Sequence, residues 1–284
     1  MTTPQTVLIT GCSSGMGRET ALALHRLGHR VHATARRPDS LADLAAQGIF
    51  TYPLDVTDES SMTAVVAAVE AEHGQVDILI NNAAYGLHMP VETASPDEVR
   101  AQFDTNVFGL VRMAQLVLPG MRRAGHGRIV NISSMGGRFS PPGGAFYHAS
   151  KHAVEAISDS LRLEVSGFGV RVVVVQPGPT ITEFGATAVG TMQRDPASES
   201  ADPYADFRRE LAAMYADRTF TRSKGAVSAE TAARVVVRAA TVARPRARYA
   251  IGTMARATML AKRLLPDAAF DAVMRRNFPL PRTV

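Results

Sequence analysis

Residues 7–17 read VLITGCSSGMG, a short apolar run followed by a turn that contains three glycines. Apolar residues then recur at helical spacing, so the pattern predicts a strand, a glycine-rich loop and a helix. In that context Gly11 permits a tight turn, Gly15 lets the backbone approach a pyrophosphate, and Gly17 lets the helix pack on the strand. The helix N-terminus offers free N–H groups to phosphates. The loop therefore predicts a dinucleotide site, with a plain flexible turn as the alternative.

The second strand of the pattern, residues 31–35, ends without an acidic residue. In dinucleotide-binding folds an acid at this point binds the ribose 2′-hydroxyl of NAD, whereas an arginine accommodates the 2′-phosphate of NADP. Here Arg36 and Arg37 follow the strand, and the Arg36 guanidinium can offer a bidentate fork to a phosphate. We therefore expect NADP as the cofactor and NAD as a weaker alternative, with Ser13 and Ser14 adding hydroxyl contacts. Two exposed loop arginines are the competing interpretation.

Apolar runs of strand length alternate with helical patterns along most of the chain. This alternation predicts a single α/β domain, residues 1–284, with a Rossmann-like, doubly wound parallel sheet. We expect strands at residues 7–10, 31–35, 49–54, 76–80, 128–132, 170–175 and 249–252, and helices at 61–73, 97–121, 147–165 and 230–241. Ligands bind at the carboxyl ends of such strands. One crevice should therefore collect the glycine loop, Arg36, Asp55, Asn81, Ser134 and residues 177–182.

Two segments depart from this alternation. Residues 185–225 are polar at first and then helix-like around residues 207–215, which favours a helical substrate lid, with an ordinary surface insertion as the alternative. Residues 254–284 form a helical tail with two short amphipathic patterns around Pro266. We expect the tail to pack on the core or to line an apolar pocket. A basic amphipathic tail that lies on a membrane surface is the other interpretation.

The sequence YHASK, residues 147–151, opens one of the predicted helices. Tyr147 and Lys151 are four residues apart and therefore lie on one face of that helix. A free phenol has a pKa of about 10, and a neighbouring ammonium stabilises the phenolate and lowers that pKa. The pair can then exchange a proton with a substrate oxygen near neutral pH. A half-buried ring beneath a solvated amine is the alternative.

The composition is that of an ordinary globular protein, with 46% hydrophobic residues, 20% charged residues and a formal net charge of +5. The basic residues are scattered, so we expect no nucleic-acid partner. Cys12 is the only cysteine, and the histidines show no zinc spacing with carboxylates, so we expect no disulfide within the chain and no metal site. No apolar stretch reaches the roughly 20 residues that cross a bilayer, and we see no secretory signal. These features predict a cytoplasmic protein without stable membrane insertion.

Taken together, the motifs resemble those of the short-chain dehydrogenase/reductase family over roughly residues 6–251. One departure is Ala84, where the family commonly has glycine. The family's motifs occur in order along the chain: the glycine motif (residues 10–17), the adenine-side acid (Asp55), the Asn-Asn-Ala-Gly turn (residues 81–84), the helix asparagine (Asn106), the catalytic serine (Ser134), the tyrosine–lysine pair (Tyr147 and Lys151) and the Pro-Gly loop with a downstream threonine (residues 177–182).

This resemblance implies an enzyme that transfers a hydride from NADPH to a ketone or aldehyde, or in reverse oxidises an alcohol. It implies that Tyr147 donates the proton and that Lys151 lowers the Tyr147 pKa and holds the nicotinamide ribose. Ser134 would hold the substrate oxygen, with Ser133 as the competing serine in a supporting place. Asn106 would order a water that links Lys151 to solvent. The cofactor contacts it implies come from Gly11, Ser13, Ser14, Gly15, Met16, Gly17, Arg36, Asp55, Val56, Asn82, Ala83, Tyr147, Lys151, Pro177, Gly178, Thr180 and Thr182.

Within the family, the glycine motif, the VHATARR strand and the helical tail resemble the hydroxysteroid and retinol dehydrogenase-like branch. That similarity implies a fairly bulky apolar substrate, steroid-, retinoid- or lipid-like. An acyl-thioester ketoreductase and a non-catalytic NADPH-binding regulator are the alternatives. The family often forms dimers or tetramers, which implies a homo-oligomer. Cys12 is expected to be a packing residue, and His148 and His152 to take supporting or surface places. His88 follows the cofactor turn and could edge the pocket, but we assign it no role.

Overall fold

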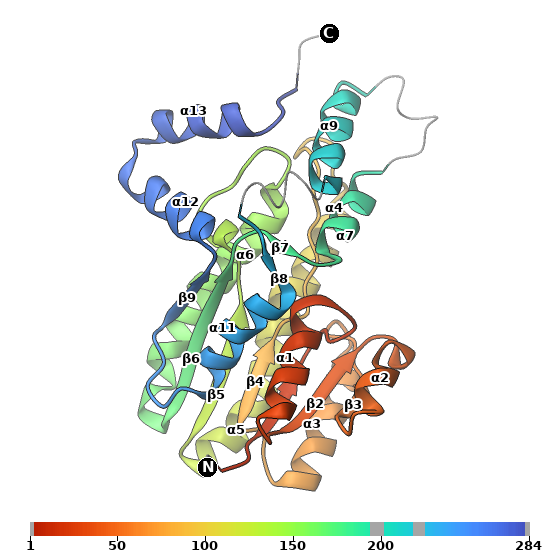
Figure 1. Cartoon of the computed structure of the whole chain (residues 1–284), viewed down its shortest axis with the longest axis vertical. Helices are drawn as coiled ribbons and strands as arrows, with labels where there is room; N and C mark the ends of the chain where they lie inside the picture. The colour runs from red at the N-terminus through yellow and green to blue at the C-terminus, as the bar shows by residue number, and fades with distance from the viewer. Residues whose placement is uncertain (1–2, 194–201, 218–224, 282–284) are drawn as a thin grey trace.

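The centre of the molecule is a seven-stranded parallel sheet in the order β3-β2-β1-β4-β5-β6-β9 (Figure 1). The computed structural model describes residues 3–193, 202–217 and 225–281. The strands are β1 (Thr6–Ile9), β2 (Arg30–Ala35), β3 (Phe50–Pro53), β4 (Ile78–Asn81), β5 (Gly127–Ile132), β6 (Val170–Pro177) and β9 (Arg248–Ile251). All seven strands that the sequence predicted are present, and the Rossmann-like, doubly wound single-domain fold is confirmed. The strand order reverses between β1 and β4, which is where such sheets bind their ligands.

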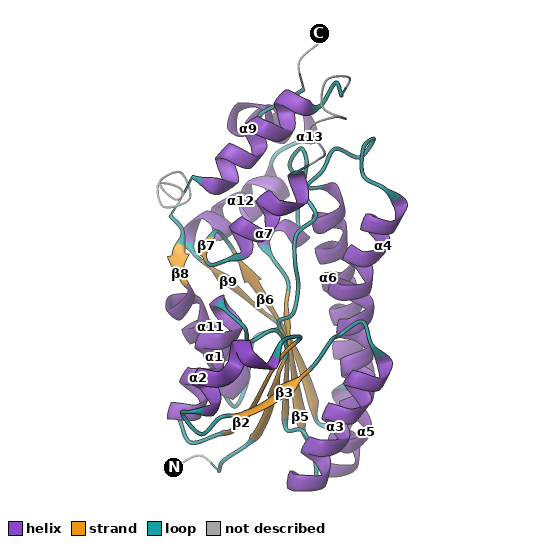
Figure 2. Cartoon of the chain, turned by 90° about the vertical axis from the view of Figure 1, so that its right-hand side faces the viewer, coloured by secondary structure: helices purple, strands orange, loops and turns teal. Residues whose placement is uncertain are grey.

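Helices cover both faces of the sheet (Figure 2). One face carries α1 (Gly15–Arg26), α11 (Ala229–Thr241), the turn η1 (Pro38–Leu41) and the short α2 (Ala42–Ala45). The other face carries α3 (Glu59–His73), α5 (Gly109–Ala124) and α6 (Ala145–Glu164), which is followed by the turn η4 (Ser166–Phe168). The sequence analysis did not predict η1 and α2, because four-residue elements are too short to show a helical period.

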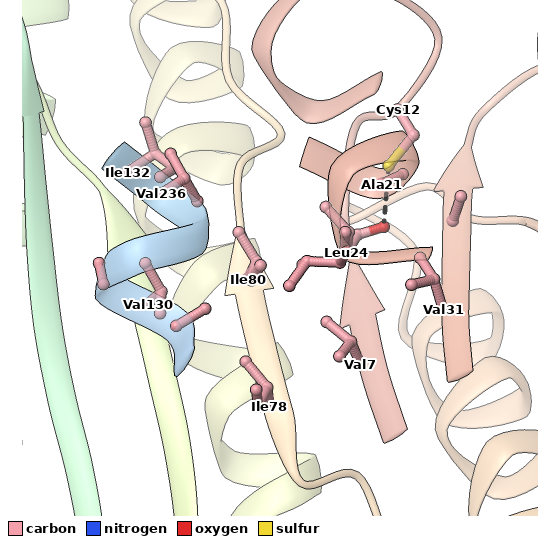
Figure 3. Close-up of a cluster of buried hydrophobic side chains, with 14 of the residues drawn as sticks. Val7, Cys12, Ala21, Leu24, Val31, Ile78, Ile80, Val130, Ile132 and Val236 are labelled. Carbon is pink, nitrogen blue, oxygen red and sulfur yellow. Dashed lines mark hydrogen bonds between the residues drawn. The ribbon is translucent and has the colours of Figure 1, made fainter. Parts of the chain in front are cut away.

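The two hydrophobic cores follow from the two-residue period of the strands. Val7 and Ile9 of β1 pack beneath α1 and α11 with Leu24 and Val236 (Figure 3). Leu8, between them in the chain, points to the opposite face and packs with residues of α3 and α5. Cys12 belongs to the first core, where burial raises the pKa of its thiol to about 12, so it is the packing residue that the sequence suggested.

The helix predicted at residues 97–121 is interrupted. It consists of α4 (Pro96–Phe103), a π-helical turn η2 (Asp104–Phe108) and α5, which follow one another directly. Ser95 caps α4 in a reciprocal pair with Glu98. A π-helical turn inserts an extra residue into the helical register and is often found at functional sites. Here it contains Asn106, which explains how an asparagine is tolerated inside a helical stretch.

A layer of helices lies beyond the carboxyl ends of the strands (Figure 1). It contains α7 (Phe184–Met192) and α9 (Ala205–Ala216), followed by α12 (Thr253–Leu264) and α13 (Asp267–Asn277). The tail therefore forms two helices on either side of Pro266, as expected. Residues 194–201 and 218–224 of the expected lid, and residues 282–284, lie outside the described residues. A small parallel pair, β7 (Thr180–Ile181) and β8 (Val227–Ser228), ties the end of β6 to the start of α11. Among the described residues, the helices are all too short or too polar to cross a bilayer.

Candidate active site

A cavity of about 1430 Å³ opens at the carboxyl ends of the central strands. It brings together most of the sequence-predicted site residues, although they come from seven separate parts of the chain. Those that line it are Gly11, Ser13, Ser14, Gly15, Met16, Gly17, Arg36, Asp55, Val56, Asn82, Ala83, Ser134, Tyr147, Lys151, Pro177, Gly178, Thr180 and Thr182. Asn81 and Asn106, also expected at the site, do not line the cavity. The Asn81 amide is buried and donates to Leu110 O and Asn131 Oδ1.

The glycine loop has the geometry that its sequence predicts. Gly11 and Gly15 have φ values of 74° and 57°, a region that side chains other than glycine rarely adopt. A Cβ atom on Gly17 would lie 2.4 Å from Asn82 Nδ2 and 2.5 Å from Gly11 O, so α1 approaches the loop too closely for any larger residue. Ser14 is the N-cap of α1, and the first turn of this helix therefore faces the cavity with free N–H groups.

Asn82 and Thr10 hold two of the cavity loops together. The Asn82 amide donates to Thr10 O at 3.0 Å and to Gly11 O at 2.9 Å. The Thr10 hydroxyl accepts hydrogen bonds from the backbone N–H groups of Asn82 and Ala83, both at 3.0 Å. The Asn82 side chain thus braces the glycine loop, which leaves its backbone as the part that can face a ligand.

Arg36 and Asp55 also line the cavity, from the carboxyl ends of β2 and β3. Arg36 is exposed at the end of β2, next to the glycine loop in the cavity lining. The Asp55 carboxylate accepts hydrogen bonds from the backbone N–H and the hydroxyl of Thr57, at 2.9 and 2.7 Å. This half of the cavity therefore combines a fixed carboxylate with an exposed guanidinium.

Tyr147 and Lys151 lie on one face of α6, as their spacing predicts, but the pKa of Tyr147 moves in the opposite direction from the prediction. Burial raises the pKa of Tyr147 to about 12, while its hydrogen bond with the Ser134 side chain acts in the lowering direction. Lys151 Nζ lies 5.9 Å from the centre of the Tyr147 ring and donates to Ile132 O at 2.9 Å. Burial lowers the pKa of Lys151 to about 8, against the opposing effect of Glu155. In this structure desolvation of the phenol therefore outweighs its hydrogen bond with Ser134.

Ser134 is the serine that faces the phenol. It is the N-cap of η3 (Met135–Gly137), and its hydroxyl oxygen accepts a hydrogen bond from Gly136 N at 3.0 Å. Ser133 also lines the cavity, but its hydroxyl is buried and has no hydrogen-bond partner among the described residues. Because this hydroxyl oxygen is inaccessible, Ser133 contributes other atoms to the cavity wall. The supporting place that its spacing suggested stays a prediction.

The Asn106 amide has partners, as its place in a helix requires, but they lie behind the cavity. Its Nδ2 donates to Tyr85 O at 2.9 Å and to Ser150 Oγ at 3.0 Å, and its Oδ1 accepts from Tyr85 N at 3.1 Å. Ser150 in turn donates to Tyr147 O at 2.6 Å. Asn106 therefore fixes the loop after β4 against the helix that carries the catalytic pair.

Sequence reasoning missed an aromatic wall around Tyr147. The rings of His88, Phe184 and Tyr215 surround it: His88 and Phe184 lie 5.6 and 5.3 Å from the Tyr147 ring centre, and Tyr215 lies 4.6 Å from that of His88. Burial lowers the pKa of His88 to about 4, so its ring is neutral at pH 7. The position of His88 shortly after the cofactor turn was the only signal in the sequence, whereas Phe184 and Tyr215 come from α7 and α9.

The far end of the cavity is apolar and is built by the tail. Helices α12 and α13 present Ala257, Ala261, Phe270, Val273 and Met274 to it. Phe270 and Met274 also form a small core with Phe139, which fixes α13 against the loop after β5. His148 lies beside this loop and its Nδ1 lies 2.6 Å from Phe139 O, so the supporting place expected for His148 fits what is seen.

Comparison with known proteins agrees with this arrangement. Residues 5–192 match the short chain dehydrogenase family. A 3-ketodihydrosphingosine reductase of Bacteroides thetaiotaomicron is 44% identical over 181 residues, which cover 64% of this chain and 66% of that protein. An uncharacterized oxidoreductase of Escherichia coli, YbbO, is 34% identical over 272 residues, which cover 95% of this chain and 94% of that protein.

Solved structures give the same result over the whole chain. A short-chain dehydrogenase from Streptomyces avermitilis superposes with a TM-score of 0.76 at 31% identity, covering 97% of this chain and 96% of that one. The closed form of a serine dehydrogenase in complex with NADP+ superposes with a TM-score of 0.73 at 29% identity. The match covers 87% of this chain and 94% of that one. On the strength of the family match, the relatives and the shared fold, this chain belongs to the short-chain dehydrogenase/reductase family of oxidoreductases.

Proposed function

We propose that this protein is an NADP(H)-dependent reductase of ketones or aldehydes, and that it acts on a bulky, lipid-like substrate. The observation that carries the proposal is the composition of the cavity: a glycine loop and Arg36 at one end, the contact between Tyr147 and Ser134 in the middle, and an apolar wall of tail helices at the other end. A nicotinamide dinucleotide and an apolar substrate would meet at Tyr147.

The residues present fit a nicotinamide dinucleotide. The cradle at Gly11 and Gly15 leaves no room for side chains, the first turn of α1 offers N–H groups to a pyrophosphate, and Arg36 offers a bidentate fork to a 2′-phosphate. The absence of an acid at the end of β2 is the reason to prefer NADP over NAD. The NADP+ named in the serine dehydrogenase structure supports the same preference.

The reaction needs a hydride at the carbonyl carbon, which the bound dinucleotide supplies, and a proton at the carbonyl oxygen. Tyr147 donates that proton from its hydroxyl, because a phenol with a pKa raised to about 12 is fully protonated at neutral pH. Ser134 stabilises the negative charge that develops on the same oxygen. The Lys151 ammonium, held by Ile132 O, holds the nicotinamide ribose and stabilises the phenolate left behind.

The protonated phenol favours the reductive direction at neutral pH, since alcohol oxidation would need the phenolate as base. Asn106 stands as the proposed anchor of a water that links Lys151 to solvent, so that the proton given up by Tyr147 can be replaced. Helices α7 and α9 are proposed as the lid, because they place Phe184 and Tyr215 over the catalytic tyrosine.

The substrate class follows from the apolar end of the cavity. A long acyl chain or a fused-ring system would lie along Phe270, Val273 and Met274, with its carbonyl at Tyr147. The 3-ketodihydrosphingosine reductase among the relatives acts, by its name, on a long-chain ketone, which favours a lipid-like substrate over the steroids and retinoids of the branch that the sequence suggested.

We also propose a homo-oligomer in the cytoplasm. Leu163 of α6 and Phe108, the last residue of η2 before α5, are 71% and 59% exposed, and the core of an interface between copies is apolar. A second copy packed on these two helices would cover them, and the mass of the protein in solution by light scattering tests this.

The test of the activity is NADPH consumption with a panel of long-chain 3-ketones, steroids, retinals, short ketones and acetoacetyl thioesters. We expect turnover with carbonyl compounds, and a preference for the long-chain ketones over the short ones. Preference for acetoacetyl thioesters would favour the acyl-thioester ketoreductase. Tight NADPH binding without turnover of any carbonyl would favour the non-catalytic regulator.

A further inference from the structure

His32 is a fully buried polar residue that the fold leaves without hydrogen bonds. It lies in β2 and is 0% exposed, and neither Nδ1 nor Nε2 has a partner among the described residues. A neutral imidazole carries one N–H donor and one acceptor, and leaving them unpaired inside a protein is unfavourable. A buried polar group in this state needs an explanation, and a bound ion is one of the standard ones.

The place of the His32 ring is set by its neighbours. It stacks on Phe50 of β3, with ring centres 4.7 Å apart and an angle of 10° between the planes. It meets the ring of His73 edge to face, with centres 5.0 Å apart and an angle of 64°. The stack with Phe50 fixes the plane of His32, while His73 comes from the last position of α3, on the same side of the sheet.

A carboxylate completes the group. His32, Glu72 and His73 each offer one ligand atom, and the three atoms lie within 4.8 Å of one another. His73 Nε2 is buried without a hydrogen bond and lies 3.6 Å from Glu72 Oε1. Two partly or fully buried imidazoles with unpaired nitrogens therefore converge with an oxygen ligand at one point between β2 and the end of α3.

We propose that His32, Glu72 and His73 form a binding site for a divalent transition-metal ion, best suited to Zn²⁺. Two imidazoles and a carboxylate are donors that zinc prefers, and they leave a fourth position for water. At Zn–N and Zn–O bond lengths of about 2.0–2.2 Å, tetrahedral ligand atoms lie about 3.4 Å apart. Small rotations of Glu72, whose side chain is 43% exposed, and of His73 would close the remaining distance.

The surroundings supply a supporting hydrogen bond and an entry route. The Tyr52 hydroxyl bonds to the Glu72 carboxylate, the kind of outer contact that orients a metal ligand. A hollow of about 600 Å³ opens beside His73. Arg30 also lines this hollow and places a positive charge near the site, which opposes the binding of a cation. Its guanidinium is engaged with another group, since it donates to Pro4 O at 3.4 Å.

The proposed ion would join β2 to the end of α3 and would act on stability rather than on catalysis. His32, Glu72 and His73 are absent from the lining of the catalytic cavity, so reductase activity is not the readout. An ion that binds only the folded chain raises the melting temperature by mass action, by roughly 5–10 °C at 100 times its Kd for a chain of this size.

The first experiment uses the full-length protein, stripped of metal with a chelator and titrated with Co²⁺. We expect one equivalent to bind with the visible absorption bands of four-coordinate Co²⁺, and Zn²⁺ to displace it. Zn²⁺ should also raise the melting temperature. No such bands, or no thermal shift at saturating Zn²⁺, would overturn the proposal.

Variants separate this site from surface binding. Glu72→Gln and His73→Asn change partly exposed ligands and should weaken Co²⁺ binding at least tenfold in an intact fold. His32→Phe should abolish Co²⁺ binding. Its metal-free melting temperature should equal or exceed that of the metal-free unmodified protein, because the change removes two unpaired nitrogens from the ring stack with Phe50. The matched control is His126→Asn, a 58% exposed histidine that lines the same hollow beside Asp77. Binding that survives in the ligand variants, or that falls equally in His126→Asn, would refute the assignment.

Discussion

Lys151 and Tyr147 occupy successive turns of α6, with the ammonium 5.9 Å from the centre of the phenol ring and bound to Ile132 O. Burial drives their two pKa values in opposite directions, to about 8 for the ammonium and to about 12 for the phenol. At neutral pH both groups therefore keep their protons. In the proposed reaction the pair would give a proton to the carbonyl oxygen as the hydride arrives, and the amine is the member that titrates nearer to physiological pH.

The pH dependence of NADPH use should therefore report Lys151. The ammonium form is complete below a pKa of about 8 and is lost above it, so kcat/KM for NADPH should fall as the pH rises through about 8. The measurement is an initial-rate profile at subsaturating NADPH. Lys151→Arg is the control, since a guanidinium stays protonated over this range. Whatever its absolute rate, a fall at the same pH in that variant would assign the titration to another group.

Removing the Tyr147 hydroxyl should abolish turnover without loss of cofactor binding. Tyr147→Phe keeps the ring that packs against His88 and Phe184, so the cavity retains its shape. Loss of a general acid costs about 10²–10⁴-fold in rate. Stopped-flow or steady-state kcat gives the rate, and fluorescence titration gives the Kd for NADPH. A variant with near-normal kcat would exclude Tyr147 as the proton donor.

Arg36 should set the choice between the two nicotinamide cofactors. It lines the cavity from the end of β2, where NAD-specific folds carry an acid. Arg36→Ala should raise the Kd for NADPH by about 10–100-fold, because it removes a hydrogen-bonded charge pair with the 2′-phosphate. The Kd for NADH, which lacks that phosphate, should stay almost unchanged. Arg37→Ala is the matched control in the adjacent position. Equal losses for NADPH and NADH would mean that Arg36 does not contact the 2′-phosphate.

Most of the fold and of the cavity lining could be predicted from the sequence because both depend on local patterns. The seven strands are apolar runs, and parallel strands send their carboxyl ends to one edge, which is why residues from Gly11 to Thr182 converge. What could not be predicted depends on how distant segments pack. The pKa of Tyr147 follows from its burial beneath α7 and α9, which no local pattern records.

The same limit explains the residues that the sequence missed. His88 owes its place to Tyr215, which reaches it from another part of the chain. The proposed ligands His32 and His73 show no metal-binding spacing because one lies in β2 and the other at the end of α3, four elements later. Asn106 was recognised as unusual in a helix, yet the π-helical turn that accommodates it has no sequence signature of its own.

Gly17 should tolerate no larger residue. A Cβ atom there would overlap Asn82 Nδ2 and Gly11 O, the two groups that hold the glycine loop together. Gly17→Ala should destabilise the protein by about 1–3 kcal/mol and weaken NADPH binding at least tenfold. Gly190→Ala in α7 is the control, because its Cβ would meet nothing within 4 Å. Chemical denaturation and NADPH titration measure both effects, and equal behaviour of the two variants would refute the packing argument.

Val273 should discriminate between long and short substrates. Its side chain lines the apolar end of the cavity from α13 and is 40% exposed, so a polar replacement there need not disturb the core. Val273→Asp places a carboxylate beside the proposed path of an acyl chain. The lost apolar contact is worth about 1.5 kcal/mol, or roughly tenfold in kcat/KM for a long-chain ketone. A short ketone that reaches only Tyr147 serves as the internal control and should keep its rate. If kcat/KM falls equally for both ketones, α13 does not form the substrate wall. If kcat/KM falls for neither ketone, the long chain leaves the cavity by another route.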